Sequence, residues 1–335
     1  MVRLVPRRLG RLLGRRHLSA ATADASEPGT GACCFPPRDA GLVSNVNFVA
    51  GTIMAGREVF PLFSAAALPP GTMLRQFPYL DAVQENAWFA FFAPLVYRDG
   101  DPRHHDSALL MQLPRSQGLA ADPVFRVPAA TRALYARPDF PEWRKRTHAT
   151  LGPLLRPAPA VASAVETMLA DLPAPRIGVH VRHPSHGVEQ GLVLFADYFG
   201  AIDRLLDETP DASLFLATDT ELALAAFRLR YGTRVRWQAE AVRSSIDDLL
   251  VWADAAARGT VDAMGFVDGV GHQTHYRLAA AGGGADGIRA GVEAATDLFT
   301  LARCDSFVCT LSNFTLACSY LNPDQRQILV AWRMV

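Results

Sequence analysis

The second half of the chain alternates between short apolar segments and longer amphipathic ones, and this alternation limits the possible folds more than any other feature. Strands that alternate with helices of ten or more residues form βαβ units, whose strands lie parallel in one sheet. The pattern therefore predicts an α/β domain with a doubly wound parallel sheet. Strands are expected at residues 177–181, 213–217, 234–237, 306–309 and 327–331, and helices at 195–207, 221–231, about 286–302 and after Asn313.

The first half of the chain contains a second, weaker α/β pattern. Residues 32–63 are compatible with an apolar strand, a turn that contains Gly41, a helix through 47–55 and a strand at 58–63. A glycine at such a turn lets backbone N–H groups approach a phosphate, which makes Gly41 a candidate binding residue. The aromatic segment 84–97 is expected to form core.

Prolines concentrate in the middle of the chain, where they interrupt regular structure and indicate a connection between two units. One helix, 161–172, is expected there. A chain of 335 residues that is 50% hydrophobic is long enough to bury two cores. We therefore expect a boundary within 155–175, between an N-terminal α/β domain (31–160) and a C-terminal one (161–335).

The charge and cysteine content exclude some classes of protein. The formal net charge is zero, which gives no electrostatic reason to expect a nucleic-acid partner. The five cysteines lack metal-ligand spacing and are expected to be buried free thiols.

The N-terminal segment, residues 1–30, has an unusual composition. Its first 23 residues hold six arginines and no acid, which resembles an organelle transit peptide; a disordered basic tail or a misplaced start codon are the alternatives. No run of about 20 apolar residues indicates a membrane span. The compartment is therefore left open.

The strand expected at 177–181 leads into a motif, IGVHVRHPSHGVEQ, that carries several chemically active side chains. Side chains alternate along a strand, so His180 and Arg182 share one face. Sheets of this kind bind ligands at the carboxyl ends of their strands, and a planar guanidinium suits a diphosphate. The following loop offers three more groups, of which the carboxylate or an imidazole could act as a base: His183, His186 and Glu189.

Polar residues also follow other strands or lie on the helices beside them. Asp219 ends one strand, while Thr310, Ser312 and Asn313 lie between a strand and a helix, where hydroxyl and backbone donors become available to a phosphate. Asp297 lies among apolar helical residues and needs a partner. Simpler alternatives are that Asp219 and Ser312 cap helices and that Asp297 forms a structural ion pair. Their coincidence at one sheet edge favours a binding site.

Three motifs in this order, HVRHPSHGVEQ, LFLATDT and DLFTLARCDSFVCTLSN, resemble the donor-domain motifs of the GDP-fucose-dependent alpha-1,6-fucosyltransferases. HVRH and LARC resemble the bacterial nodulation fucosyltransferases, and VCTLSN resembles the animal core-fucosylation enzymes. The resemblance covers about residues 176–330. It implies a GT-B-like fold of two Rossmann-like domains, of which the C-terminal one binds the nucleotide sugar. It also implies inverting transfer of fucose from GDP-fucose to a hydroxyl of a glycan or glycoconjugate, with no metal and no cofactor.

The resemblance also implies roles for individual residues. Arg182 would hold the β-phosphate of GDP and neutralise the leaving group, and His180 and Asp297 would contact guanine. Ser312 and Asn313 would line the phosphates. A diphosphate that leaves without a metal needs guanidinium and helix-end donors to carry its charge, and these residue types supply them.

The loop after the motif departs from the family's pattern. His183 stands where the animal enzymes carry a second arginine, and it is kept as a candidate substrate-binding residue. Their proposed base lies ten residues beyond the motif histidine, whereas Glu189 lies nine beyond His180. Glu189 and His186 therefore both remain candidate bases. Asp219 would help to organise the site, and the acceptor and the linkage are left open.

Other classes of function fit less well. The main alternative is a non-catalytic GDP-sugar or glycan-binding protein with the same fold. A metal site built from the histidines at 180, 183 and 186, or at 272 and 275, is disfavoured because no cysteine or acid completes either set at familiar spacing. No GxGxxG motif follows a strand, which argues against a dinucleotide oxidoreductase. The family's Golgi location is not expected to carry over, because no signal anchor is evident.

Overall fold

The computed structural model describes residues 31–68, 72, 77–80, 86–97, 101, 106–115, 123–125, 128–182, 193–260 and 284–330. The predicted N-terminal segment 1–30 lies outside the described residues. So do five histidine and glutamate residues considered above: His183, His186, Glu189, His272 and His275.

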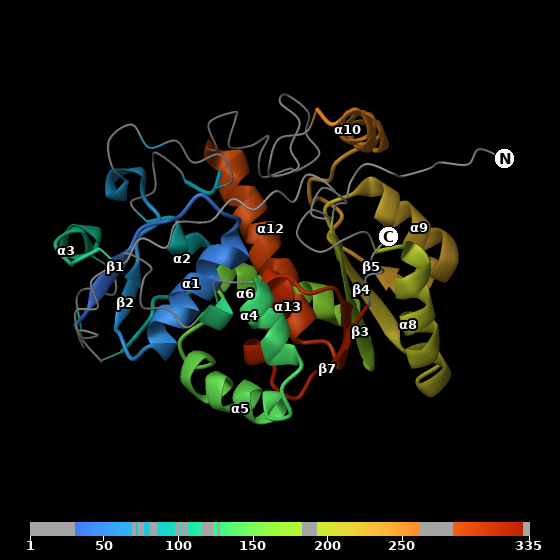
Figure 1. Ribbon diagram of the computed structural model, residues 1–335, viewed down its shortest axis with the longest axis horizontal. Coiled ribbons are helices and arrows are strands. Elements are labelled where there is room, and N and C mark those ends of the chain that lie inside the picture. Colours follow the sequence, from blue (N-terminus) through green and yellow to red (C-terminus); the bar gives the residue numbers. More distant parts are fainter. Residues whose placement is uncertain are drawn as a thin grey trace.

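The C-terminal part contains a five-stranded sheet with the order β5-β4-β3-β6-β7, in which every pair of neighbours is parallel. Its carboxyl-terminal strand ends lie at a common edge because the strands are parallel (Figure 1). The prediction of an α/β fold with a C-terminal parallel sheet is therefore confirmed. The strands are β3 (Arg176–Val181), β4 (Ser213–Thr218), β5 (Val235–Arg236), β6 (Ser306–Cys309) and β7 (Arg326–Leu329).

Helices cover both faces of this sheet, because successive strand side chains point to opposite faces. Val179 and Leu216 pack with α8 (Phe195–Glu208) and α9 (Glu221–Tyr231) in one cluster. Phe215 and Phe307 belong to a second cluster, with α12 (Gly284–Ala302), α13 (Asn313–Leu321) and α6 (Pro159–Ala170). Figure 1 shows α8 and α9 on one side of the strands and α12 and α13 on the other. Two more helical segments in this part are η6 (Gly232–Arg234) and α10 (Ile246–Arg258).

The N-terminal part begins with the predicted strand, helix and strand. They form β1 (Cys33–Phe35), α1 (Leu42–Met54) and β2 (Val59–Pro61), and the two strands pair in parallel. The helix begins at Leu42, earlier than expected, because the apolar residues just after Gly41 already face the core. The remaining helical segments of this part are η2 (Ala65–Ala67), α2 (Trp88–Phe91), α3 (Ser107–Met111), η4 (Pro123–Phe125), α4 (Pro128–Tyr135) and α5 (Phe140–Leu151).

The described residues of the aromatic segment 84–97 are largely core, as the sequence predicts. Trp88, Phe91 and Phe92 are fully buried, and the Trp88 ring stacks on the Phe92 ring with centroids 4.5 Å apart. Phe92 also contacts Phe299 of α12, with centroids 5.8 Å apart. The segment thus helps to join the N-terminal part to the C-terminal helices.

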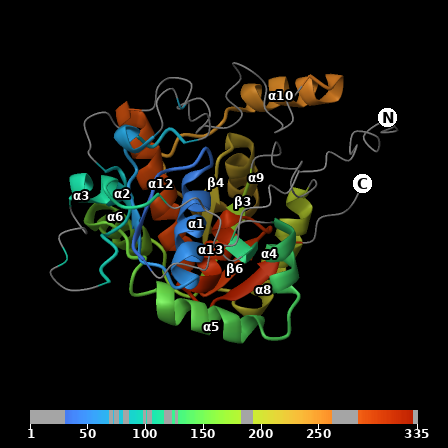
Figure 2. The ribbon, with the colours of Figure 1, turned by 60° about the vertical axis from the view of Figure 1, so that its left-hand side comes forward.

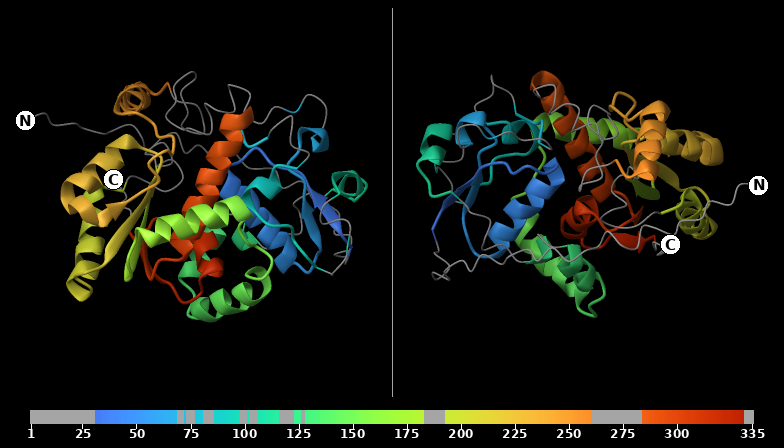
Figure 3. Two further views of the ribbon diagram at one scale, coloured as in Figure 1. Left: turned by 180° about the vertical axis from the view of Figure 1, so that it is seen from behind. Right: turned by 45° about the horizontal axis from the view of Figure 1, so that its top comes forward.

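One continuous core joins the two parts, with α1, α2 and α6 all packed against α12 (Figure 2). Figure 3 shows α6, in yellow-green, crossing α12, in orange-red. The approach of α12 depends on glycine: a Cβ on Gly287 would overlap the carbonyl oxygen of Pro78, and one on Gly291 would overlap the Phe91 ring. The domain boundary within 155–175 stays a prediction.

All five cysteines are free and buried, as predicted. Within the described residues, no helix combines the length and the apolar character that a membrane crossing requires.

Candidate functional site

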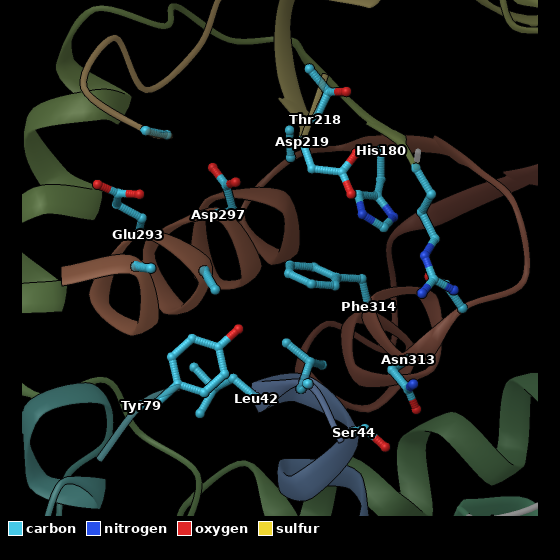
Figure 4. A pocket seen from close by; sticks show the side chains of 18 of the residues that line it. Leu42, Ser44, Tyr79, His180, Thr218, Asp219, Glu293, Asp297, Asn313 and Phe314 are labelled. Atoms are coloured by element: carbon cyan, nitrogen blue, oxygen red, sulfur yellow. The ribbon is translucent and has the colours of Figure 1, made fainter. Parts of the chain in front are cut away.

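A cavity of about 390 Å³ lies where the carboxyl ends of the central strands meet α12, α13 and the start of α1. Its volume falls in the range of pockets that hold small ligands. Figure 4 shows His180, Thr218 and Asp219 on one side of it, Tyr79, Leu42 and Ser44 on another, and Glu293 and Asp297 on α12. Most of the predicted site residues that the structure describes line this cavity: Gly41, His180, Arg182, Asp219, Asp297, Ser312 and Asn313.

His180 enters the cavity from the end of β3. Its side chain is buried, and its ring stacks on the Phe314 ring with centroids 4.6 Å apart. Burial, and then the nearby Arg182 guanidinium, lower the pKa of His180 to about 3, so its imidazole is neutral at physiological pH. Nδ1 of His180 is buried without a hydrogen-bond partner among the described residues. A neutral imidazole in this position can recognise a polar group of a ligand.

Asp297 lies on α12 one turn after Glu293. Nε2 of Gln238 donates to Oδ1 of Asp297 at 2.5 Å and to the backbone carbonyl of Glu293 at 2.8 Å. Burial raises the pKa of Asp297 to about 7, although the Gln238 hydrogen bond and the Arg243 guanidinium lower it; Glu293 adds to the increase. Asp297 is therefore held in the cavity wall by an amide donor, and its charge responds to pH near neutrality.

Asp219 follows β4, and its side chain lines the cavity. Its backbone carbonyl accepts a hydrogen bond from the Ser244 N–H at 2.8 Å. The next residue, Thr220, caps α9, because its hydroxyl accepts from the Ala223 N–H at 3.1 Å. The residue that caps α9 is therefore Thr220 and not Asp219, and the Asp219 carboxylate lines the cavity.

The start of α13 forms the part of the wall beside β6. Ser312 is the N-cap of this helix, and its hydroxyl accepts from the Thr315 N–H at 3.2 Å. Both the capping interpretation and the predicted position at the cavity therefore hold for Ser312. Asn313 and Phe314 follow in the first turn and also line the cavity. Backbone N–H groups at a helix start favour an anion.

Thr310 is placed differently from the sequence prediction. Its side chain is buried, is hydrogen-bonded to Tyr198, and does not line the cavity. Its carbonyl accepts a hydrogen bond from the Thr315 hydroxyl. Thr310 thus supports the turn that leads into α13.

The N-terminal part supplies the opposite wall through the start of α1. Gly41 is the N-cap of this helix, and a Cβ at this position would meet nothing within 4 Å. The backbone of Leu42 contacts the buried hydroxyl of Tyr79, whose pKa burial raises. The wall therefore offers the positive end of a helix, with open space beside Gly41.

Several residues of the site were missed by the sequence analysis. Gln238 follows the short strand β5, and its position at a strand end was a usable signal. Arg243, Glu293 and Tyr79 gave no local signal, because their relation to the cavity depends on the tertiary fold. Asn47 does not line the cavity but bonds to Asn313, which does; a polar residue in an apolar helical run is a signal for such a buried partner.

The described residues contain no group of three or more His, Cys, Asp or Glu side chains that could hold a metal ion. The groups that line the cavity include one guanidinium, one imidazole, four carboxylates and two helix starts.

No protein-family model matches the sequence, and no curated protein matches it. Among solved structures, fucosyltransferase NodZ from Bradyrhizobium is similar, with 16% identity over 87% of this chain and 93% of that chain and a TM-score of 0.47. POFUT1 in complex with GDP-fucose is 12% identical over 93% of this chain and 100% of that chain, with a TM-score of 0.44. These similarities concern the fold alone, so the function is argued from the residues of the cavity.

Proposed function

We propose that the cavity binds GDP-fucose and that the protein transfers fucose to a hydroxyl of a glycan or glycoconjugate, with inversion and without a metal or cofactor. The observation that carries this proposal is the convergence, in one cavity, of groups that suit a diphosphate and groups that suit a guanine base. The motif resemblance described above points to the same donor.

The diphosphate end of the donor fits the side of the cavity where Arg182 meets the start of α13. The guanidinium can form two parallel hydrogen bonds to phosphate oxygens. Ser312 and Asn313 begin a helix whose positive N-terminal end attracts negative charge, and Gly41 begins another. These donors would stabilise the negative charge that develops on GDP as it leaves.

The base end of the donor would lie between His180 at the end of β3 and Asp297 on α12. An ionised carboxylate accepts two hydrogen bonds at once from the adjacent ring N–H and amino group of guanine. Adenine and uracil do not present that pair of donors. The neutral imidazole of His180 lies on the same side of the cavity as the end of β4 and supplies a further polar contact.

Inverting transfer requires a base that takes the proton from the acceptor hydroxyl. The candidates, Glu189 and His186, lie outside the described residues, so their roles remain predictions. We expect Glu189→Gln to leave GDP affinity unchanged and to lower turnover of GDP-fucose at neutral pH. If that variant is fully active and His186→Ala is not, the base is His186.

The experiment that tests the proposed function measures GDP release from GDP-fucose, with and without a panel of glycan acceptors, alongside GDP binding. The proposal expects both binding and turnover. Tight GDP binding without any turnover would support the alternative, a non-catalytic GDP-sugar or glycan-binding protein. Absence of GDP binding would overturn both.

A further inference from the structure

Asn47 is a fully buried polar residue in the middle of α1, and its hydrogen bonds cross from the N-terminal part to α13. Its Nδ2 donates to Oδ1 of Asn313 at 3.0 Å and to the backbone carbonyl of Asn313 at 3.1 Å. Its Oδ1 accepts from the hydroxyl of Tyr320, also fully buried, at 2.8 Å. Every polar atom of the Asn47 side chain is thus engaged with the helix that borders the cavity.

The direction of these hydrogen bonds fixes the orientation of both amides. A backbone carbonyl can only accept, so the group that faces the Asn313 carbonyl must be the NH₂ of Asn47. That NH₂ can only donate, so the Asn313 atom that faces it must be the amide oxygen. The amide nitrogen of Asn313 therefore points away from Asn47. Because Asn313 is exposed and lines the cavity while Asn47 is buried behind it, this nitrogen is available on the cavity side.

We propose that Asn47 is a positioning residue that orients Asn313 so that its side chain presents a hydrogen-bond donor to the diphosphate of the ligand. The inference rests on the proposed function and deepens it. With the opposite orientation, Asn313 would present an oxygen to the phosphates, and an acceptor beside an anion is repulsive.

The arrangement also gives the N-terminal part a specific task at the site. Asn47 comes from a helix 266 residues away in sequence from Asn313, so the orientation of the amide depends on how α1 packs against α13. Figure 4 shows Asn313 beside the start of α1, where Ser44 is labelled. The two parts of the chain thus jointly set one donor of the diphosphate site.

The test is a double-mutant cycle between Asn47 and Asn313, with GDP and guanosine as ligands in calorimetric titrations. Asn47→Leu keeps a side chain of similar size but leaves the Asn313 amide free to rotate, and Asn47→Ala serves if the leucine variant does not fold. We expect each of Asn47→Leu and Asn313→Ala to weaken GDP binding by about tenfold, the loss of one charge-assisted hydrogen bond. Guanosine, which lacks the diphosphate, should bind within about twofold of the wild-type affinity.

The double variant separates positioning from a general effect on structure. If Asn47 acts through Asn313, the double variant binds GDP about as weakly as either single variant, because the effects are not additive. The matched control is Thr52→Val, also buried on α1, whose hydroxyl donates to the Phe48 carbonyl of its own helix at 2.9 Å. It should leave GDP affinity unchanged.

Two results would overturn the inference while the proposed function stands. The first is an equal loss of GDP and guanosine affinity in the Asn47 variants. The second is a double variant whose fold-loss in GDP affinity equals the product of the fold-losses of the two single variants. A wild-type protein that binds no GDP would overturn the proposed function and this inference together.

Discussion

The two walls of the cavity are built in different ways. The wall from the C-terminal sheet presents charged and polar side chains at strand ends and on the adjoining helices, among them Arg182, Asp219 and Asp297. The wall from the N-terminal part presents the backbone of a helix start, at Gly41 and Leu42, and a buried tyrosine. In the proposed function the C-terminal part carries the chemistry, whereas the N-terminal part supplies shape, a helix start and, by our inference, the contact that orients Asn313.

The largest effect is expected on the C-terminal wall, from Arg182→Lys. Lysine keeps the positive charge but loses the planar fork that can bind two phosphate oxygens. We expect turnover of GDP-fucose to fall by about a hundredfold or more, as when one preorganised charge-stabilising donor is removed. The control is Arg204→Lys on the exposed face of α8, which should leave turnover unchanged. Near-normal turnover in the Arg182 variant would remove the main reason for assigning the chemistry to this wall.

The packing of the two parts against each other is tested by Gly287→Ala. The new Cβ would overlap the carbonyl oxygen of Pro78, and a backbone atom cannot move aside cheaply. We expect the free energy of unfolding to fall by about 1–3 kcal/mol, measured by urea denaturation. The matched control is Gly200→Ala in α8, where the nearest atom is the end of the Arg204 side chain at 3.9 Å. That change should stabilise the protein by about 0.4–1 kcal/mol. Equal effects of the two substitutions would show that α12 does not need this close approach.

The pH dependence of GDP binding tests the guanine side of the C-terminal wall. The pKa of Asp297 is raised to about 7, and in the proposed function its ionised form accepts two hydrogen bonds from guanine. GDP affinity should therefore rise with pH up to about 7 and fall about tenfold for each unit below it. His180, with a pKa near 3, contributes no step in this range. With guanosine, which carries no titrating phosphate, the step near pH 7 should disappear in Asp297→Asn; if the step persists, Asp297 is not the titrating group.

The raised pKa of Asp297 has the opposite effect on the stability of the ligand-free protein, which falls as the pH increases. The pKa of Asp297 is higher in the folded state than its ordinary value of 3.8, so the folded state binds more protons between that pH and about 7. The stability that this group contributes is present below pH 3.8 and is lost as the pH rises to about 7. Stability measurements on the wild type and on Asp297→Asn over this range provide a check that needs no ligand.

The difference between the two parts also explains what the sequence could predict. Strand β6 and helix α9 were predicted with the observed bounds, and the prediction for β3 differs by one residue. These bounds could be predicted because the spacing of apolar residues in this part of the sequence is regular. The strand expected at 234–237 is only two residues long in the structure, as β5. Helix α10, in the irregular stretch after β5, was not predicted. Such short or isolated elements depend on tertiary contacts that a local pattern does not contain.

The same limit applies to the site. Strand ends of a parallel sheet must meet at one edge, so His180, Arg182 and Asp219 could be placed together from the sequence alone. The contacts of Gln238 with Asp297 and of Asn47 with Asn313 join residues 59 and 266 positions apart. No local pattern encodes such pairs, and only the packing of the two parts reveals them.

By our proposal, the two walls together form a site for a guanine nucleotide. The most direct measurement is a calorimetric titration of the purified protein with GDP, UDP and NAD. We expect GDP to bind in preference to both others, and GDP at about 100 times its dissociation constant to stabilise the protein by roughly 2.7 kcal/mol. No binding of GDP, or equal binding of GDP and UDP, would contradict it.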